Sequence, residues 1–122
     1  MKTARYIFLS LVLFMSCDKE EEPIGPTADF AYTANYLIVS FIDSSIAGDG
    51  TINRWTWNFG DGSTSTAQNP VHTYAEDGTY SVSLTVTDKN SLNDTFTEEI
   101  VVEAPIGPTA DFAYTANYLI VS

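Results

Sequence analysis

Few side chains in this 122-residue sequence could do chemistry. The chain has a single Cys, Cys17, and a single His, His72, so an intramolecular disulfide and zinc sites with several Cys or His ligands are excluded. Glu98 and Glu99 are adjacent, and on a strand adjacent side chains face opposite sides, so the two cannot act as a pair on one substrate. No G-x-S-x-G nucleophile motif is present. We therefore expect that the chain is not an enzyme and has no catalytic residue.

Asp43 and Asp49 are the candidate metal ligands. Asp49 begins the sequence Asp-Gly-Thr-Ile, which resembles the end of a calcium loop. The full EF-hand pattern fails, because Ser45 and Ala47 stand where two earlier ligands should be. A simple Asp-Gly turn explains the same residues without a metal ion. We expect no required cofactor and retain calcium, bound by Asp43 and Asp49, as the alternative.

The charge of the chain limits its partners. Five Lys and Arg residues stand against sixteen Asp and Glu residues, which gives a net charge of −11. Nucleic acid is an unsuitable partner, because binding phosphates requires clustered basic side chains. Electrostatic attraction to anionic lipid is disfavoured for the same reason. The length suffices for one modest domain.

Residues 1–16 have the layout of a signal peptide. Two basic residues precede the apolar run 6–15, which is too short for a membrane-spanning helix of about 20 residues. Cys17 follows directly, and the segment resembles a bacterial lipoprotein signal, although Phe14 and Met15 depart from its usual residues. The resemblance implies acyl chains on Cys17 and stable membrane anchoring through them. An ordinary secretory signal with an incidental Cys is the alternative.

Residues 17–25 are predicted to form an acidic tether. The run Asp-Lys-Glu-Glu-Glu at 18–22 is at least a solvated linker. It also resembles the tether that directs lipoproteins of the Bacteroidota to the outer face of the outer membrane. The expected location is therefore the cell outer membrane, with the rest of the chain extracellular.

An exact internal repeat divides the chain. Residues 24–40 and 106–122 both read IGPTADFAYTANYLIVS, each copy follows a proline, and the copies are 82 residues apart. Such self-similarity predicts a tandem architecture. We expect one complete unit at 26–103, and a linker with the start of an incomplete second repeat at 104–122. Because 17 residues cannot bury their own apolar face, this second copy is expected to be disordered or to add to a sheet edge.

The complete unit shows the period of β-strands. In residues 79–88, Tyr80, Val82, Leu84 and Val86 alternate with Ser and Thr, which predicts a strand with one apolar face. Similar runs predict strands at 28–36, 37–41, 54–59 and 95–103, separated by Gly, Asn, Asp and Pro. In the first of these strands, Phe30, Tyr32 and Tyr36 are expected to share one face. Short strands at this spacing are typical of an all-β sandwich.

The complete unit contains three motifs, which read WNFGDG at 57–62, NPVHTY at 69–74 and GTYSVSLTV at 78–86. Together they resemble the PKD domain, an immunoglobulin-like repeat of extracellular proteins. Asn58 replaces the family's usual Asp. The motif residues are Trp57, Phe59, Gly60, Asp61, Gly62, Asn69, Pro70, His72, Tyr74, Gly78, Tyr80 and Val82. The resemblance covers about 26–103 and implies a seven-stranded immunoglobulin-like β-sandwich; some PKD-like domains also bind calcium near the loop that contains Asp49.

Each motif also has a structural interpretation. Trp57 and Phe59 would fill the core between the sheets, and two glycines would supply the backbone freedom of a tight turn. Asp61 could accept backbone N–H groups within that turn. His72 and Tyr74 would lie under the neighbouring loop, and residues 77–82 resemble a tyrosine corner.

These patterns favour a non-catalytic extracellular spacer or adhesion module of a lipid-anchored surface protein, in contact with protein or carbohydrate. The alternative is an N-terminal accessory domain of a polysaccharide or protein hydrolase whose catalytic part lies beyond Ser122. Exposed aromatic side chains gathered in one patch would favour glycan binding.

Overall fold

The computed structural model describes residues 20–107, so Cys17, the signal segment and most of the second repeat copy lie outside the described residues. Those residues contain seven strands and no helix that could cross a membrane. The strands are β1 (Phe30–Asn35), β2 (Ile38–Asp43), β3 (Ile52–Asn58), β4 (Thr64–Ser65), β5 (Val71–Thr73), β6 (Gly78–Asp88) and β7 (Asn93–Val102).

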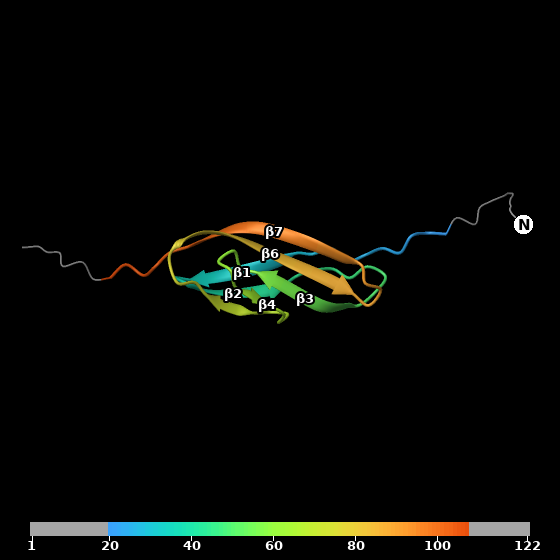
Figure 1. Ribbon diagram of the computed structural model, residues 1–122, viewed down its shortest axis with the longest axis horizontal. Helices are drawn as coiled ribbons and strands as arrows, with labels where there is room; N and C mark the ends of the chain where they lie inside the picture. Colours follow the sequence, from blue (N-terminus) through green and yellow to red (C-terminus); the bar gives the residue numbers. More distant parts are fainter. Residues whose placement is uncertain (1–19, 108–122) are drawn as a thin grey trace, which may run out of the picture.

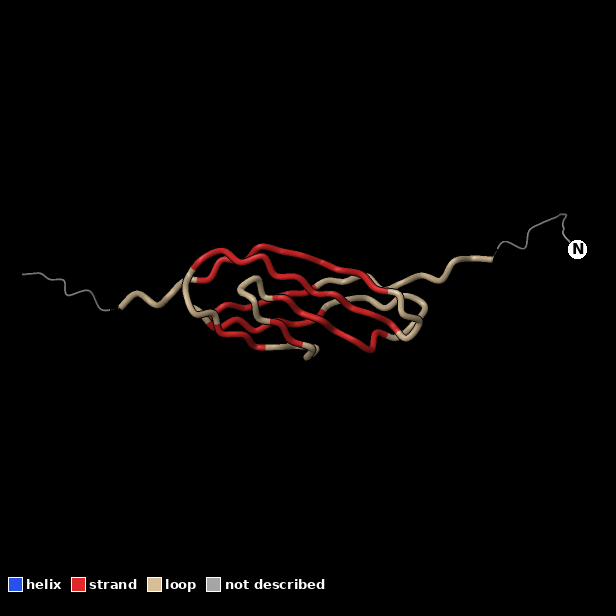
Figure 2. The backbone as a smooth tube through the Cα atoms, in the orientation of Figure 1, coloured by secondary structure: helices blue, strands red, loops and turns tan. Residues whose placement is uncertain are grey.

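The strands form two antiparallel sheets that pack as a sandwich (Figure 1). One sheet has the order β1-β2-β5 and the other has the order β4-β3-β6-β7. Strands make up most of the body of the domain, and loops join them at its two ends and along its side (Figure 2). The predicted all-β, seven-stranded sandwich is confirmed. Residues 20–23 and 103–107 leave the domain at opposite ends of its long axis (Figure 1).

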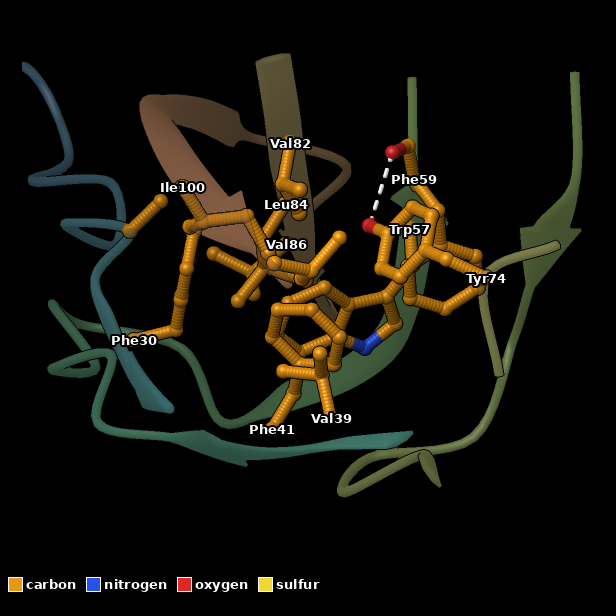
Figure 3. Packing of buried hydrophobic residues seen from close by; sticks show 12 residues of the cluster. Phe30, Val39, Phe41, Trp57, Phe59, Tyr74, Val82, Leu84, Val86 and Ile100 are labelled. Carbon is orange, nitrogen blue, oxygen red and sulfur yellow. Dashed lines mark hydrogen bonds between the residues drawn. The ribbon is translucent and has the colours of Figure 1, made fainter. Parts of the chain in front are cut away.

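The core consists of the inward faces of both sheets. Val82, Leu84 and Val86 of β6 are fully buried, as the alternation predicted. Trp57 lies at the centre, with its ring centroid 5.1 Å from that of Phe30 and 5.1 Å from that of Phe41 (Figure 3). The other buried apolar residues are Ala28, Val39, Phe59, Tyr74, Ile100 and Val102. The tyrosine, tryptophan and phenylalanine rings therefore supply much of the apolar surface that holds the sheets together.

The prediction that Tyr36 shares one face with Phe30 and Tyr32 is wrong. Asn35 pairs with Ile38, so only two residues connect β1 to β2. A connection this short needs a left-handed residue, and Tyr36 takes that role with φ of 58°. The turn directs its side chain outward, where it is 58% exposed.

Candidate functional site

The glycine turn after β3 is closed by its own hydrogen bonds. Gly60 and Gly62 have φ of 86° and 95°, in the left-handed region that favours glycine. Asp61 Oδ1 accepts the Ser63 N–H at 3.0 Å, as predicted. Asn58, the departure from the family motif, accepts the Gly60 N–H at 3.0 Å. The amide oxygen of Asn58 therefore makes a contact that a carboxylate could also make.

His72 and Tyr74 lie against this turn, as predicted. His72 Nε2 is 2.8 Å from Asp61 Oδ2, and its ring stacks on Phe59 with centroids 4.2 Å apart. The Tyr74 hydroxyl donates to the Phe59 carbonyl oxygen at 2.8 Å, and burial raises the pKa of Tyr74. Burial would also raise the pKa of Asp61, but hydrogen bonds from His72 and Ser63 outweigh it and lower that pKa below 3.8. The contacts with Asp61 and Phe59 therefore fix the ring of the single histidine within the domain.

Tyr80 forms the predicted tyrosine corner. Its hydroxyl donates to the Glu76 carbonyl oxygen at 2.8 Å, four residues upstream. Its ring stacks on Tyr74 with centroids 4.2 Å apart. Gly78 begins β6, and Val82 occupies the buried position after the corner.

Asn69 and Pro70 attach the loop before β5 to strand β2. Asn69 Oδ1 accepts the Asp43 N–H at 2.8 Å, and the Pro70 carbonyl accepts the Phe41 N–H at 2.9 Å. The Trp57 indole donates to the Ala67 carbonyl at 2.9 Å in the same loop. The family motif thus acts as a set of contacts between loops and strands.

The two candidate calcium ligands are both engaged by protein groups. Asp43 accepts hydrogen bonds from the Trp55 indole at 2.9 Å and from the Gln68 amide at 3.1 Å. Asp49 Oδ2 accepts the Ile24 N–H at 2.9 Å. Across residues 20–107, no group of three or more His, Cys, Asp or Glu side chains is placed to hold a metal ion. Asp43 and Asp49 are therefore not brought together with a third ligand.

Sequence patterns did not identify Asp88. This residue is 2% exposed; its Oδ1 accepts the backbone N–H groups of Asn90 and Leu92, whereas its Oδ2 is buried without a protein partner. It lies beside Gly50, where an added Cβ would be 2.9 Å from that oxygen. An unpartnered carboxylate oxygen is a suitable calcium ligand; Asp88 has one, whereas both carboxylate oxygens of Asp43 accept hydrogen bonds. The alternation of apolar residues along β6 indicates that Asp88 is buried, because it places this side chain on the inward face.

The glycine turn, the histidine beneath it and the tyrosine corner all match one family. The sequence profile described as PKD domain matches residues 22–103. The chain belongs to the PKD domain family. Its hallmark residues here form part of the core and the contacts between loops and strands.

Relatives of this PKD chain include large bacterial proteins. A pre-pro-metalloprotease, PrtV of Vibrio cholerae, is 40% identical over 99 residues, which are 80% of this chain and 10% of that protein. A microbial collagenase of Vibrio alginolyticus is 47% identical over 62 residues, which are 51% of this chain and 8% of that protein. The chain thus spans about a tenth of the length of these relatives.

Solved structures share the fold. The PKD1 domain of Vibrio anguillarum Epp is 37% identical, with a TM-score of 0.67 over 69% of this chain and 100% of that one. The PKD1 domain of PrtV is 40% identical, with a TM-score of 0.65 over 66% of this chain and 100% of that one. A structure of carbohydrate-binding modules with promiscuous specificity is 33% identical to this chain. Its TM-score is 0.65, over 75% of this chain and 40% of that one. Since the first two are isolated domains, a PKD unit of this kind folds by itself.

Proposed function

We propose that this PKD domain is a non-catalytic extracellular spacer or adhesion module, tethered to the bacterial outer membrane through acyl chains on Cys17. One observation supports the non-catalytic part of this proposal: the polar side chains of the family motif form hydrogen bonds within the domain. Asp61 and His72 bond to each other, and the Tyr74 hydroxyl donates to the Phe59 carbonyl oxygen, so all three side chains are engaged within the domain. A side chain fixed in this way is a structural element of the sandwich.

The extracellular part of the proposal rests on the sequence and on the relatives. A signal-like segment precedes the domain. Proteins named as collagenases contain segments similar to this unit, and collagen is an extracellular protein. The lipid anchor rests on the position of Cys17 after the apolar run.

Display on intact cells tests the spacer role. An epitope placed after residue 103 should be accessible to antibody on cells that express the chain with its Cys17 anchor. Deletion of residues 26–103 should reduce antibody binding, because the epitope then lies close to the membrane. Equal binding with and without the domain would show that it has no spacer role. Equal total expression, measured on lysed cells, is the control.

A second candidate is an accessory domain of a secreted or surface hydrolase, and the relatives support it at least as strongly. The matched relatives include a metalloprotease and collagenases, each much longer than this chain. Such a domain would carry a catalytic part toward protein or polysaccharide. Sedimentation of the isolated unit with insoluble collagen or cellulose tests this candidate, and specific retention would favour it over the spacer.

Glycan contact through an aromatic platform has little support in the described residues. Trp55 is half-buried, and its indole N–H is bonded to Asp43. Among residues 20–107, Tyr36 is the exposed aromatic side chain. A sugar ring would therefore meet one aromatic ring there rather than a patch.

A further inference from the structure

The two ends of the PKD unit carry exposed apolar side chains that its own core does not use. At the end where the chain leaves, Tyr36 and Val101 line a groove together with Ala34, Asn35 and Glu103. At the end where the chain enters, Ile24 and Ile46 are exposed. Apolar side chains exposed beside a surface groove are available for contact with another surface.

The segment that leads into the unit is fixed to the entry end. The Ile24 N–H donates to Asp49 Oδ2, and the Asp49 N–H donates to the Ile24 carbonyl, both at 2.9 Å. Thr27 and Ile46 exchange two backbone hydrogen bonds of 2.8 Å. Gly48 faces this segment so closely that an added Cβ would be 2.2 Å from the Ile24 carbonyl oxygen. From Ile24 onward, the chain is thus part of the unit.

A complete unit that began at Ile106 would lie very close to the first unit. Ile106 is the counterpart of Ile24, and the sequence from it is identical for seventeen residues. The strand β7 ends at Val102, so only residues 103–105 separate it from the counterpart of a fixed residue. An extended chain spans at most about 3.6 Å per residue, so Val102 and Ile106 lie within about 15 Å of each other. That distance brings the exit end of one unit against the entry end of the next.

We propose that the groove lined by Tyr36 and Val101 is the docking site for the entry end of a following copy of this same PKD unit, the copy that begins at Ile106. Ile106, the counterpart of Ile24, and the equivalent of Ile46 in a complete second unit would supply its apolar surface. Covalent linkage gives an effective concentration in the millimolar range, which favours contact between the two units. Pro105 restricts the linker further. This inference rests on the proposed spacer function. It predicts that consecutive units of the spacer are rigidly oriented relative to one another.

A two-unit chain tests the docking. It consists of residues 20–105 followed by a second copy of residues 24–103, a design that is possible because a single unit folds by itself. The only Cys of the protein, Cys17, is absent from it, so Thr97→Cys in both units gives two spin-label sites on the outer face of β7. Pulsed electron spin resonance then measures the distance between the labels. The proposal predicts one narrow distance distribution.

Identical units provide a matched control. Tyr36→Ser with Val101→Thr in the first unit removes the apolar surface of the occupied groove and should broaden the distribution at least twofold. The same two substitutions in the second unit alter a groove that no unit covers and should leave the distribution unchanged. A broad distribution in the unsubstituted chain, or equal broadening by both variants, would overturn the proposal. Neither result affects the spacer role itself, because the display experiment uses a single unit.

Discussion

The Tyr74 hydroxyl donates a buried hydrogen bond of 2.8 Å to the Phe59 carbonyl oxygen and so joins the two sheets. Tyr74 follows β5 of the three-stranded sheet, and Phe59 follows β3 of the four-stranded sheet. Figure 3 shows the bond at the edge of the aromatic core. This contact makes the glycine turn a part of the core and explains why a polar aromatic residue stands at this position.

Removal of that bond should destabilise the domain. Tyr74→Phe leaves the Phe59 carbonyl without its buried donor, and we expect a loss of about 1–2 kcal/mol. For a domain of this size, the thermal midpoint should fall by about 5–10 °C. Tyr36→Phe, the same change at an exposed ring, is the control and should have no effect. Equal midpoints for both variants would contradict the role assigned to Tyr74.

The two glycines of the turn after β3 should differ in their tolerance of alanine. Both have left-handed backbones, so each substitution costs about 1–2 kcal/mol from strain alone. At Gly60 an added Cβ would also be 2.5 Å from the Ser81 carbonyl oxygen, whereas at Gly62 it would meet nothing within 4 Å. Urea unfolding should therefore show a clearly larger loss for Gly60→Ala. A loss at Gly62→Ala as large as at Gly60→Ala would mean that close packing on Ser81 is unimportant.

Acid should weaken the domain through Asp43 and Asp61. Burial alone would raise the pKa of Asp43, but hydrogen bonds from Ser45, Gln68 and Trp55 outweigh it and hold that pKa below 3.8. A carboxyl whose pKa is lowered by folding stabilises the fold above its unfolded pKa, near 4, and loses this contribution as the pH falls through its folded pKa.

Unfolding free energies measured from pH 6 to pH 2.5 should therefore decline below about pH 4. The decline should be shallower in Asp43→Asn than in the wild type. Asp77→Asn, at an exposed turn residue, is the matched control and should retain the wild-type slope. If Asp43→Asn also kept that slope, another group would be responsible for the acid sensitivity.

The effect of calcium on stability should depend on Asp88 rather than on Asp43. Its Oδ2 is buried without a protein partner, whereas Asp43 is engaged by Trp55 and Gln68. We expect millimolar Ca²⁺ to raise the thermal midpoint of the wild type relative to EDTA, and Asp88→Asn to abolish that increase. Asp43→Asn should retain it. Identical midpoints in Ca²⁺ and EDTA would exclude a calcium site in the domain.

The second repeat copy should contribute little to the stability of the first unit. All buried apolar residues of the described core lie between Ala28 and Val102. A chain that ends at residue 105 should therefore unfold within about 1 °C of the full chain. A drop of several degrees would mean that residues 106–122 pack on the unit or add to one of its sheets.

Sequence patterns predict the long strands because each has one buried face. The alternation in β6 and the motif residues Trp57 and Phe59 identify five of the twelve buried apolar residues of the core. The short strands β4 and β5 have two and three residues, which is too few to show a period. The prediction for Tyr36 failed, since the alternation says nothing about where a hairpin turns. Asp88 escaped prediction because a single Asp at the end of an apolar face forms no metal-binding pattern in the sequence.

Mass spectrometry of the mature N-terminus tests the proposal of an anchored module most directly. The full chain would be expressed in a bacterium that has an outer membrane and would be purified from the membrane fraction. We predict a mature chain that begins at Cys17, with its mass increased by a diacylglyceryl group and an amide-linked acyl chain, and Cys17→Ser should abolish both the cleavage and the modification. A chain that is cleaved elsewhere and carries an unmodified Cys17 would contradict the lipid anchor and would favour a secreted accessory domain.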